Sequence, residues 1–343
     1  MNFASDNAYG AWPEMLAALS HANDGAVQSY GDDEITSRVR EKFSRAFGRE
    51  VSVHPVVTGT AANALALATL VPPHGAILCH KESHIARDEC GAVEFYTHGA
   101  KLVEIEGHGA KLVPQAIETT LKHFQKGFVH HSQPKAVSIT QASELGTVYT
   151  CEEIAAIAKL AHAHDMKLHM DGARFANALV HLGCTPAEAT WQAGVDALSF
   201  GATKNGALAA EAVIFFSAED AADFEYRRKK AGHLLSKMRF VSAQLDACLD
   251  NNLWLKRAAH ANTLARRMAD ALAQIPGAEL AHLVQSNAIF ARLPDATVAR
   301  LREAGARFYD WEPAEGGRTL IRLVLSFATP EQDVVRFLSI ARK

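Results

Sequence analysis

The stretch Leu168-His169-Met170-Asp171-Gly172-Ala173-Arg174 decides the fold, because it is a short apolar run that ends on a carboxylate. A second run of the same kind ends on a lysine and reads Ser199-Phe200-Gly201-Ala202-Thr203-Lys204-Asn205-Gly206. Short apolar runs bounded by turn residues are typical of buried strands. We therefore expect Asp171 and Lys204 to lie at the C-terminal ends of two strands.

An aspartate and a lysine in these two places suit pyridoxal 5'-phosphate (PLP). A lysine amine forms a Schiff base with the aldehyde of this cofactor. An aspartate pairs with the pyridine nitrogen and keeps it protonated, so that the ring accepts electrons. Neither residue alone would indicate a cofactor, because Lys204 by itself reads as a solvated lysine at a helix start. Together they predict that Lys204 carries PLP and that Asp171 tunes it.

The composition is that of an ordinary globular protein. The chain has 343 residues, of which 48% are hydrophobic and 21% are charged, and its net charge is −3. A chain of this length has material for a large core and usually divides into two domains. The small net charge gives no sign of a nucleic-acid partner.

The cysteines and the N-terminus bear on the compartment. The five cysteines are scattered and form no CxxC or CxxH pair, so they indicate neither a disulfide framework nor a zinc site. We expect a reduced cytoplasm and no metal. The N-terminal residues do not resemble a signal peptide, and no apolar run is long enough to span a membrane.

Helical patterns alternate with short apolar strands. This alternation predicts an α/β fold with right-handed crossovers and a mainly parallel sheet covered on both faces. The expected strands are 76–79, 136–139, 167–170, 197–200 and 212–216. Capping patterns predict helices after Thr150, Thr185 and Thr329.

The domain division is expected near residue 245. Residues 1–245 would form an N-terminal arm and a large domain, and 246–343 a smaller α+β domain. A long polar-faced helix around 253–274 would link to the smaller domain, with strands at 288–291 and 320–324.

Thr58-Gly59-Thr60-Ala61-Ala62-Asn63 precedes an alanine- and leucine-rich helix. The first turn of such a helix offers unpaired N–H groups and the positive end of the dipole. Gly59 lets the backbone approach an anion, and Thr60 adds a hydroxyl. A plain helix cap is the alternative. Asp171 and Lys204 further along favour a phosphate cradle at Gly59 and Thr60.

At this point the chain resembles the threonine aldolases, which belong to the aspartate-aminotransferase-like (fold type I) PLP enzymes. The resemblance covers nearly the whole chain. It is carried by 3–7 (FASDN), 30–33 (YGDD), 58–63 (TGTAAN), 84–92 (HIARDECGA), 169–174 (HMDGAR), the Lys204 segment and 321–324 (IRLV). The chain departs from many members at 140–149, where TQASELGTVY replaces an Asn-Thr-His-Asn run. The resemblance implies retro-aldol cleavage of L-threonine and L-allo-threonine to glycine and acetaldehyde.

The resemblance also implies roles for individual residues. His84 would stack on the pyridine ring, and His130 would be a second active-site histidine. Deprotonating the β-hydroxyl calls for a base, for which His84, His130 or a water held between them are the alternatives.

Arg322 and Arg174 would hold the substrate carboxylate, since arginine suits planar carboxylates. Arg174 would also contact the cofactor, and Ser5 would add a hydroxyl. An unpaired arginine is costly within an apolar strand, which favours a functional partner for Arg322.

Several residues are expected to act across a subunit interface. Tyr30 and the N-terminal arm would reach a neighbouring subunit, where Tyr30 would help to bind the substrate. Lys229 and Arg239 would contact that subunit's cofactor phosphate. We therefore expect a homodimer or homotetramer that acts on a small-molecule β-hydroxy amino acid. The sequence leaves open a phenylserine aldolase, a β-eliminating lyase, an aminotransferase or a catalytically silent binding protein.

Overall fold

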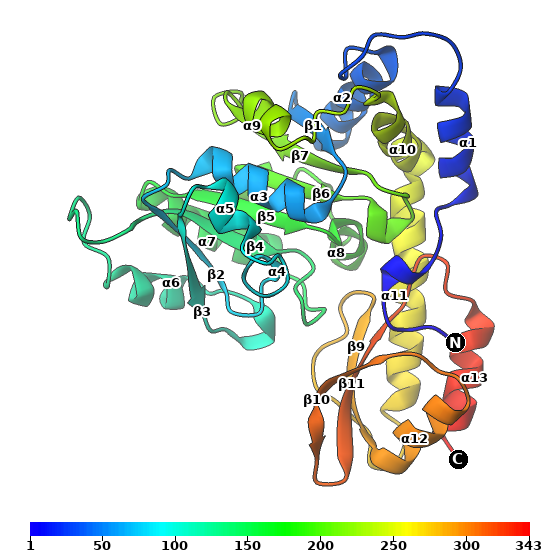
Figure 1. Cartoon of the computed structure of the whole chain (residues 1–343). Coiled ribbons are helices and arrows are strands. Elements are labelled where there is room, and N and C mark those ends of the chain that lie inside the picture. Colours follow the sequence, from blue (N-terminus) through cyan, green and yellow to red (C-terminus); the bar gives the residue numbers. More distant parts are fainter.

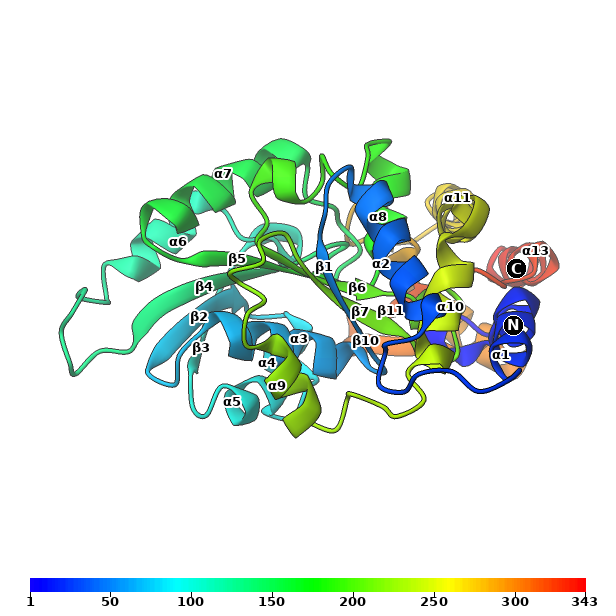
Figure 2. The same ribbon diagram turned by 90° about the horizontal axis from the view of Figure 1, so that it is seen from above.

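The computed structural model describes all 343 residues. A seven-stranded sheet, ordered β1-β7-β6-β5-β4-β2-β3, forms the centre of the larger part of the molecule (Figures 1 and 2). Only β7 runs against the other strands, so the expected mainly parallel sheet is confirmed. The strands are β1 (Ser52–Val56), β2 (Gly75–His80), β3 (Lys101–Ile105), β4 (Gln133–Thr140), β5 (Lys167–Gly172), β6 (Ala197–Gly201) and β7 (Glu211–Phe215).

Helices cover both faces of this sheet (Figure 2). One face carries α2 (Glu34–Phe47), α7 (Cys151–Ala163) and α8 (Phe175–Leu182), and the other carries α3 (Gly59–Leu70), α5 (Ala92–Tyr96) and α9 (Phe224–Lys230). The remaining helices of this part are α1 (Pro13–Ala22), α4 (His84–Arg87), α6 (Pro114–Leu121) and α10 (Arg239–Leu249).

Two helix starts show why the chain folds this way. Thr150 and Glu153 form the expected capping box at α7, and each side chain accepts the other's backbone N–H. Thr58 caps α3 through its hydroxyl, which accepts the N–H of Ala61 at 3.2 Å. Residues 61–68 of α3 are all buried, because the helix lies between the sheet and α5 and α9.

The smaller part is built on an antiparallel sheet of the order β10-β11-β9-β8 (Figure 1). Its strands are β8 (Glu279–Leu280), β9 (Ala288–Pro294), β10 (Tyr309–Glu315) and β11 (Arg318–Val324). Its helices are α11 (Leu253–Leu272), α12 (Asp295–Glu303) and α13 (Glu331–Ala341). The two strands and the long helix expected from the sequence are therefore present.

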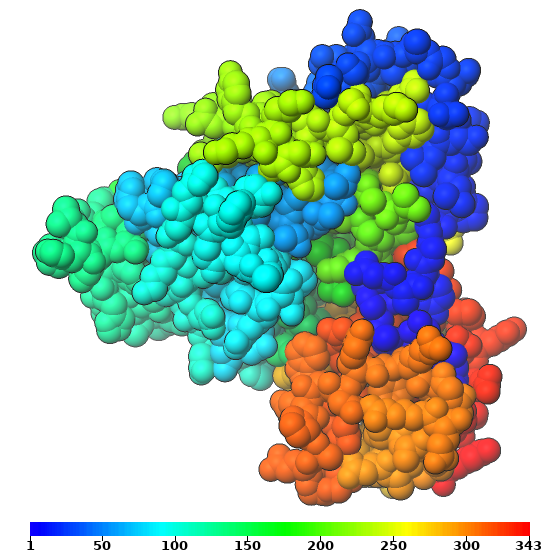
Figure 3. Space-filling model, in the orientation of Figure 1, coloured from blue at the N-terminus to red at the C-terminus, as the bar shows by residue number.

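The N-terminal segment and α11 each join the two cores. Phe3 is fully buried in the core of the smaller part, and Trp12 is buried in that of the larger one. Figure 3 shows this segment, in blue, seated against both parts. Along α11, Trp254 belongs to the larger core and Leu264 to the smaller one. The division at residue 245 stays a prediction.

The prediction of a helix after Thr185 was wrong. Thr185 and Glu188 do make the reciprocal capping contacts, with Glu188 donating its N–H to the Thr185 hydroxyl at 3.3 Å. Residues 186–190 form turns, and a short 3₁₀ helix, Trp191–Ala193, follows them. No α-helix continues through this segment, because Thr190 leaves the helical region with φ −130° and ψ −104°. No helix combines the length and apolarity that a membrane span requires.

Gly206 is the position where a side chain would disturb the fold most directly. Its φ is +110°, and a Cβ there would lie 1.8 Å from Nε1 of the buried Trp12. We expect Gly206→Ala to lower the free energy of unfolding by at least about 3 kcal/mol, from steric overlap added to backbone strain. Urea unfolding of the cofactor-free protein measures it.

Gly232→Ala is the matched control, because φ is +79° there and no atom lies within 4 Å of the added Cβ. It should cost only about 1 kcal/mol of backbone strain. Equal losses in the two variants would contradict the proposed contact with Trp12.

Candidate active site

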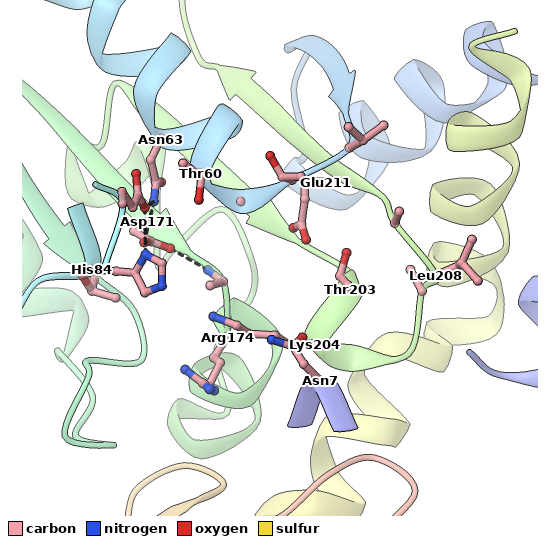
Figure 4. A pocket seen from close by; sticks show the side chains of 18 of the residues that line it. Asn7, Thr60, Asn63, His84, Asp171, Arg174, Thr203, Lys204, Leu208 and Glu211 are labelled. Carbon is pink, nitrogen blue, oxygen red and sulfur yellow. Dashed lines mark hydrogen bonds and ion pairs between the residues drawn. The ribbon is translucent and has the colours of Figure 1, made fainter. Parts of the chain in front are cut away.

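A cavity of about 540 Å³ lies at the C-terminal ends of β4, β5 and β6, beside the first turn of α3 (Figure 4). The main sheet is mainly parallel, so its strand ends and the following loops meet at this edge. The cavity is lined by six of the sequence-predicted site residues: Gly59, Thr60, His84, Asp171, Arg174 and Lys204. These six residues, which are far apart in the sequence, thus lie around one cavity.

Lys204 lies in a 3₁₀ turn, Thr203–Asn205, directly after β6. Burial, with a smaller contribution from the Arg174 guanidinium, lowers the pKa of its ammonium group. The carboxylates of Asp6, Asp171 and Glu211 oppose this shift. A lysine whose pKa is lowered in a pocket is more readily available as a neutral amine nucleophile.

Asp171 lies on β5 and is 5% exposed. Its Oδ1 accepts the N–H of Ala173 at 2.9 Å, and its Oδ2 accepts Nδ2–H of Asn63 at 2.8 Å (Figure 4). These two bonds hold the carboxylate in one orientation beside the cavity. The group is therefore fixed before any ligand arrives.

The first turn of α3 is open toward the cavity. The Thr58 hydroxyl is used as a helix cap, as the plain-cap alternative supposed. The amides of Gly59 and Thr60, however, have no partner within the chain, and both residues line the cavity. Free amides at a helix N-terminus bind anions such as phosphate.

His84 begins the short helix α4, and its side chain is 38% exposed. Its Nδ1 lies 2.9 Å from Oε1 of Glu89, and its backbone N–H donates to Oε1 of Glu144 at 3.0 Å. The hydrogen bond with Glu89 is the main cause that raises the pKa of His84. The ring is thus held at the wall of the cavity by a buried carboxylate.

Arg174 pairs with a carboxylate from the N-terminal segment. Its Nε and Nη2 donate to Oδ2 and Oδ1 of Asp6 at 2.8 and 3.0 Å. Asn287 also donates to Asp6 at 3.1 Å. Nη1 of Arg174 has no partner within the chain, so one edge of the guanidinium remains available to a ligand.

Arg322 lies on β11 and does not line the cavity. Its guanidinium carbon lies 5.3 Å from the ring centre of Tyr309 and 5.1 Å from that of Trp311. Burial and the nearby Arg174 lower its pKa. The Ser5 hydroxyl accepts the N–H of Asn7, and Asn7 itself lines the cavity.

The residues expected to act across an interface lie away from this chain's cavity, and so does His130, which was expected as a second active-site histidine. Lys229 stacks 4.4 Å over the ring of Tyr30, and Arg239 donates to the backbone oxygen of Gly25 at 3.1 Å. His130 is exposed on the loop before β4, at the edge of the sheet opposite the cavity. Their site roles stay predictions, which one chain alone does not fulfil.

Sequence reasoning assigned no role to several polar residues that line the cavity, among them Asn63, Glu89, Glu144 and Glu211. Two of them carried a signal: Asn63 is the only amide in the alanine- and leucine-rich helix α3, and Glu211 is the only polar residue of β7. Burial raises the pKa of Glu144 and that of Glu211 to about 7. Oε2 of Glu144 is buried and has no partner.

Comparison with known proteins agrees with this geometry. The family described as "Beta-eliminating lyase" matches residues 2–295. The low specificity L-threonine aldolase of Pseudomonas sp. (strain NCIMB 10558) is 44% identical over 317 residues, which cover 92% of this chain and 91% of that protein. The chain belongs to the threonine aldolase family.

Solved structures of other proteins share the fold of this chain. The threonine aldolase of Leishmania major superimposes with a TM-score of 0.94 at 28% identity, covering 99% of this chain and 98% of that one. An aspartate aminotransferase from Rhodobacter sphaeroides gives a TM-score of 0.72 at 19% identity, covering 100% of this chain and 91% of that one. The expected fold type I architecture is confirmed.

Glu211 should make the stability of this threonine aldolase family member depend on pH. Its pKa rises from 4.5 to about 7 on folding, so the folded state binds more protons between these values. The free energy of unfolding should therefore fall as pH rises from about 5 through 7, since ionisation of the buried group costs energy. In Glu211→Gln this component should disappear.

Calorimetry of the cofactor-free protein between pH 5 and 8 tests this prediction. The control is Glu106→Gln, whose side chain is 83% exposed. Parallel pH profiles for the wild type and Glu211→Gln would show that Glu211 does not titrate in this range.

Proposed function

We propose that the cavity binds PLP and that the protein cleaves the Cα–Cβ bond of L-threonine and L-allo-threonine, giving glycine and acetaldehyde. The observation that carries the proposal is the meeting of Lys204, Asp171 and the first turn of α3 in one cavity. The residues fit the cofactor: Lys204 has a lowered pKa, Asp171 is buried and oriented, and the amides of Gly59 and Thr60 are unpaired.

Each residue would meet one part of PLP. Lys204 Nζ would be the point of covalent attachment, and Asp171 would pair with the ring nitrogen. Gly59 and Thr60 receive the phosphate. When bound, PLP supplies an acceptor for the electron pair that Cα–Cβ cleavage leaves on Cα.

The chain's own groups would position the substrate and move protons. Arg174 Nη1 would bind the carboxylate from the cavity wall, and Arg322, which lies near Arg174 but outside the cavity lining, would add the second guanidinium. Together they would fix the direction of the Cα–Cβ bond. His84 Nε2 accepts the proton of the β-hydroxyl as that bond breaks and the C–O bond becomes a carbonyl. A proton returned to Cα completes glycine.

A homo-oligomer in the cytoplasm belongs to the same proposal. Tyr30 and Lys229 are in contact with each other, outside the lining of this chain's cavity. Such a pair would complete the site of a second copy, with Lys229 and Arg239 at its phosphate. His130 would likewise reach a cavity only from another copy.

The assay is aldehyde release from a panel of L-threonine, L-allo-threonine, L-phenylserine and L-serine. We expect acetaldehyde and glycine from both threonine isomers. Lys204→Ala should abolish turnover, whereas Lys101→Ala, at an exposed position on β3, should leave it unchanged. Pyruvate and ammonia from L-serine, without aldehyde from threonine, would instead identify a β-eliminating lyase.

Arg322 should govern the affinity for the substrate carboxylate. Arg322→Ala should raise KM at least roughly tenfold, because a charge-assisted pair is lost. Arg322→Lys should recover little, since an ammonium cannot replace the planar fork stacked on Tyr309 and Trp311.

Arg318 is the matched control, because it lies on the same strand and pairs with Glu279 at the surface. Arg318→Ala should keep a wild-type KM. A near-normal KM in Arg322→Lys would leave Arg322 with a purely structural role.

A further inference from the structure

A continuous series of hydrogen bonds connects His84 with Asp171 at the wall of the cavity. His84 Nδ1 lies 2.9 Å from Oε1 of Glu89. The same Oε1 accepts Nδ2–H of Asn63 at 2.9 Å, and Nδ2 of Asn63 also donates to Oδ2 of Asp171 at 2.8 Å. Figure 4 shows Asn63, Asp171 and His84 gathered at one side of the cavity.

The middle of this hydrogen-bonded series is buried. Asn63 is 2% exposed, and the side chain of Glu89 is fully buried. Two buried carboxylates of like charge repel each other, and each needs donors to remain there. The Asn63 amide meets both needs, because its two N–H bonds point at one carboxylate each.

Glu89 determines which nitrogen of His84 faces the ligand. Burial raises the pKa of Glu89, while the hydrogen bonds with His84 and Asn63 lower it. In its ionised form this carboxylate accepts hydrogen bonds and donates none, so Nδ1 of His84 then carries the hydrogen that it shares with Glu89. Nε2 is then left as the proton acceptor. The hydrogen bond with Glu89 also raises the pKa of the ring.

The other charged groups around His84 act more weakly. The Lys204 ammonium lowers the pKa of His84, and the Asp171 carboxylate raises it. Glu144 contacts the backbone N–H of His84 rather than its ring. Glu89 is therefore the residue through which the basicity of His84 is set.

We propose that Glu89 is a positioning residue, which fixes the tautomer of His84 and strengthens it as a base, and that Asn63 ties this pair to Asp171. The inference deepens the proposed function and rests on it for the role of His84. His84, the proposed base, and Asp171, the proposed partner of the ring nitrogen, would thereby be held in place by the same hydrogen-bonded residues.

The first test needs neither cofactor nor substrate. NMR titration of the cofactor-free protein follows the ring of His84, whose signals are assigned by their loss in His84→Gln. We expect Glu89→Gln to lower the pKa of His84 by about one unit or more, because the neutral amide no longer stabilises the imidazolium. Glu89→Asp keeps the charge and should retain part of the shift. An unchanged pKa in Glu89→Gln would overturn the proposal.

The second test is the pH profile of kcat. If His84 must be neutral to accept the proton, kcat falls on the acidic side as His84 becomes protonated. In Glu89→Gln this acidic limb should move to lower pH, in step with the lowered pKa, and the plateau should fall roughly tenfold or more because the base is weaker. A lower plateau with an unmoved limb would make Glu89 a merely structural residue.

A matched control separates these effects from general destabilisation. His54 and Glu225 form the same kind of contact, with Nδ1 and Oε1 2.7 Å apart, but neither residue lines the cavity. Glu225→Gln should change the titration of His54 and leave the acidic limb of kcat in place. If the wild type releases no aldehyde, the proposed function fails, and the NMR result still decides the role of Glu89.

Asn63→Leu tests the link to Asp171. Leucine is close in size to asparagine but donates no hydrogen bond, so Asp171 loses one of its two donors. We expect the dissociation constant of PLP, measured by absorbance titration, to rise roughly tenfold. The control is Asn177→Leu, which breaks a buried amide pair with Asn262 outside the cavity. Equal PLP affinity in wild type and Asn63→Leu would remove Asn63 from this role.

Discussion

The burial of the Asp171 carboxylate at the end of an apolar strand is the constraint on which the site depends. A carboxylate in this position requires donors, because the residue is only 5% exposed. The backbone turn after β5 supplies one, at Ala173, and α3 supplies the other, at Asn63. To bring Asn63 there, α3 must cross the sheet with its first turn at the same edge. The helix that supplies a donor to Asp171 therefore also brings Gly59 and Thr60, the proposed phosphate-binding residues, to this edge.

The part of the site proposed to bind the substrate carboxylate depends on the charges of Arg174, Arg322 and Asp6. Arg174 lies close enough to Arg322 to lower the pKa of Arg322. The pKa of Arg174 is itself raised, because its ion pair with Asp6 outweighs the effect of burial, and Asp6 forms no such pair with Arg322. Arg322 faces two aromatic rings and the backbone oxygen of Ala4 instead of a carboxylate. The pair keeps an uncompensated positive charge, which favours an anion between them. An amino-acid carboxylate matches this in both charge and shape.

Much of this could be predicted from local pattern. Asp171 and Lys204 close apolar runs, and the capping box at Thr150 is contained in four consecutive residues. Contacts between distant segments could not be read in this way: Asp6 with Arg174, and Glu89 with Asn63, depend on how the elements pack. The turn at Thr185 shows the same limit, since its capping contacts form without a helix. The roles of Lys229, Arg239, Tyr30 and His130 were inferred from resemblance alone, and in this chain none of the four lines the cavity.

The anchoring of the N-terminal segment has a consequence for unfolding. Phe3 is packed with the smaller sheet, Trp12 with the larger one, and α11 contributes side chains to both cores. Neither core can be exposed without opening contacts that the other needs. The chain should consequently melt in a single calorimetric transition, and slow amide exchange should extend across both sheets as one cooperative unit. The two parts have separate sheets and cores, but we expect them to unfold together as one cooperative unit.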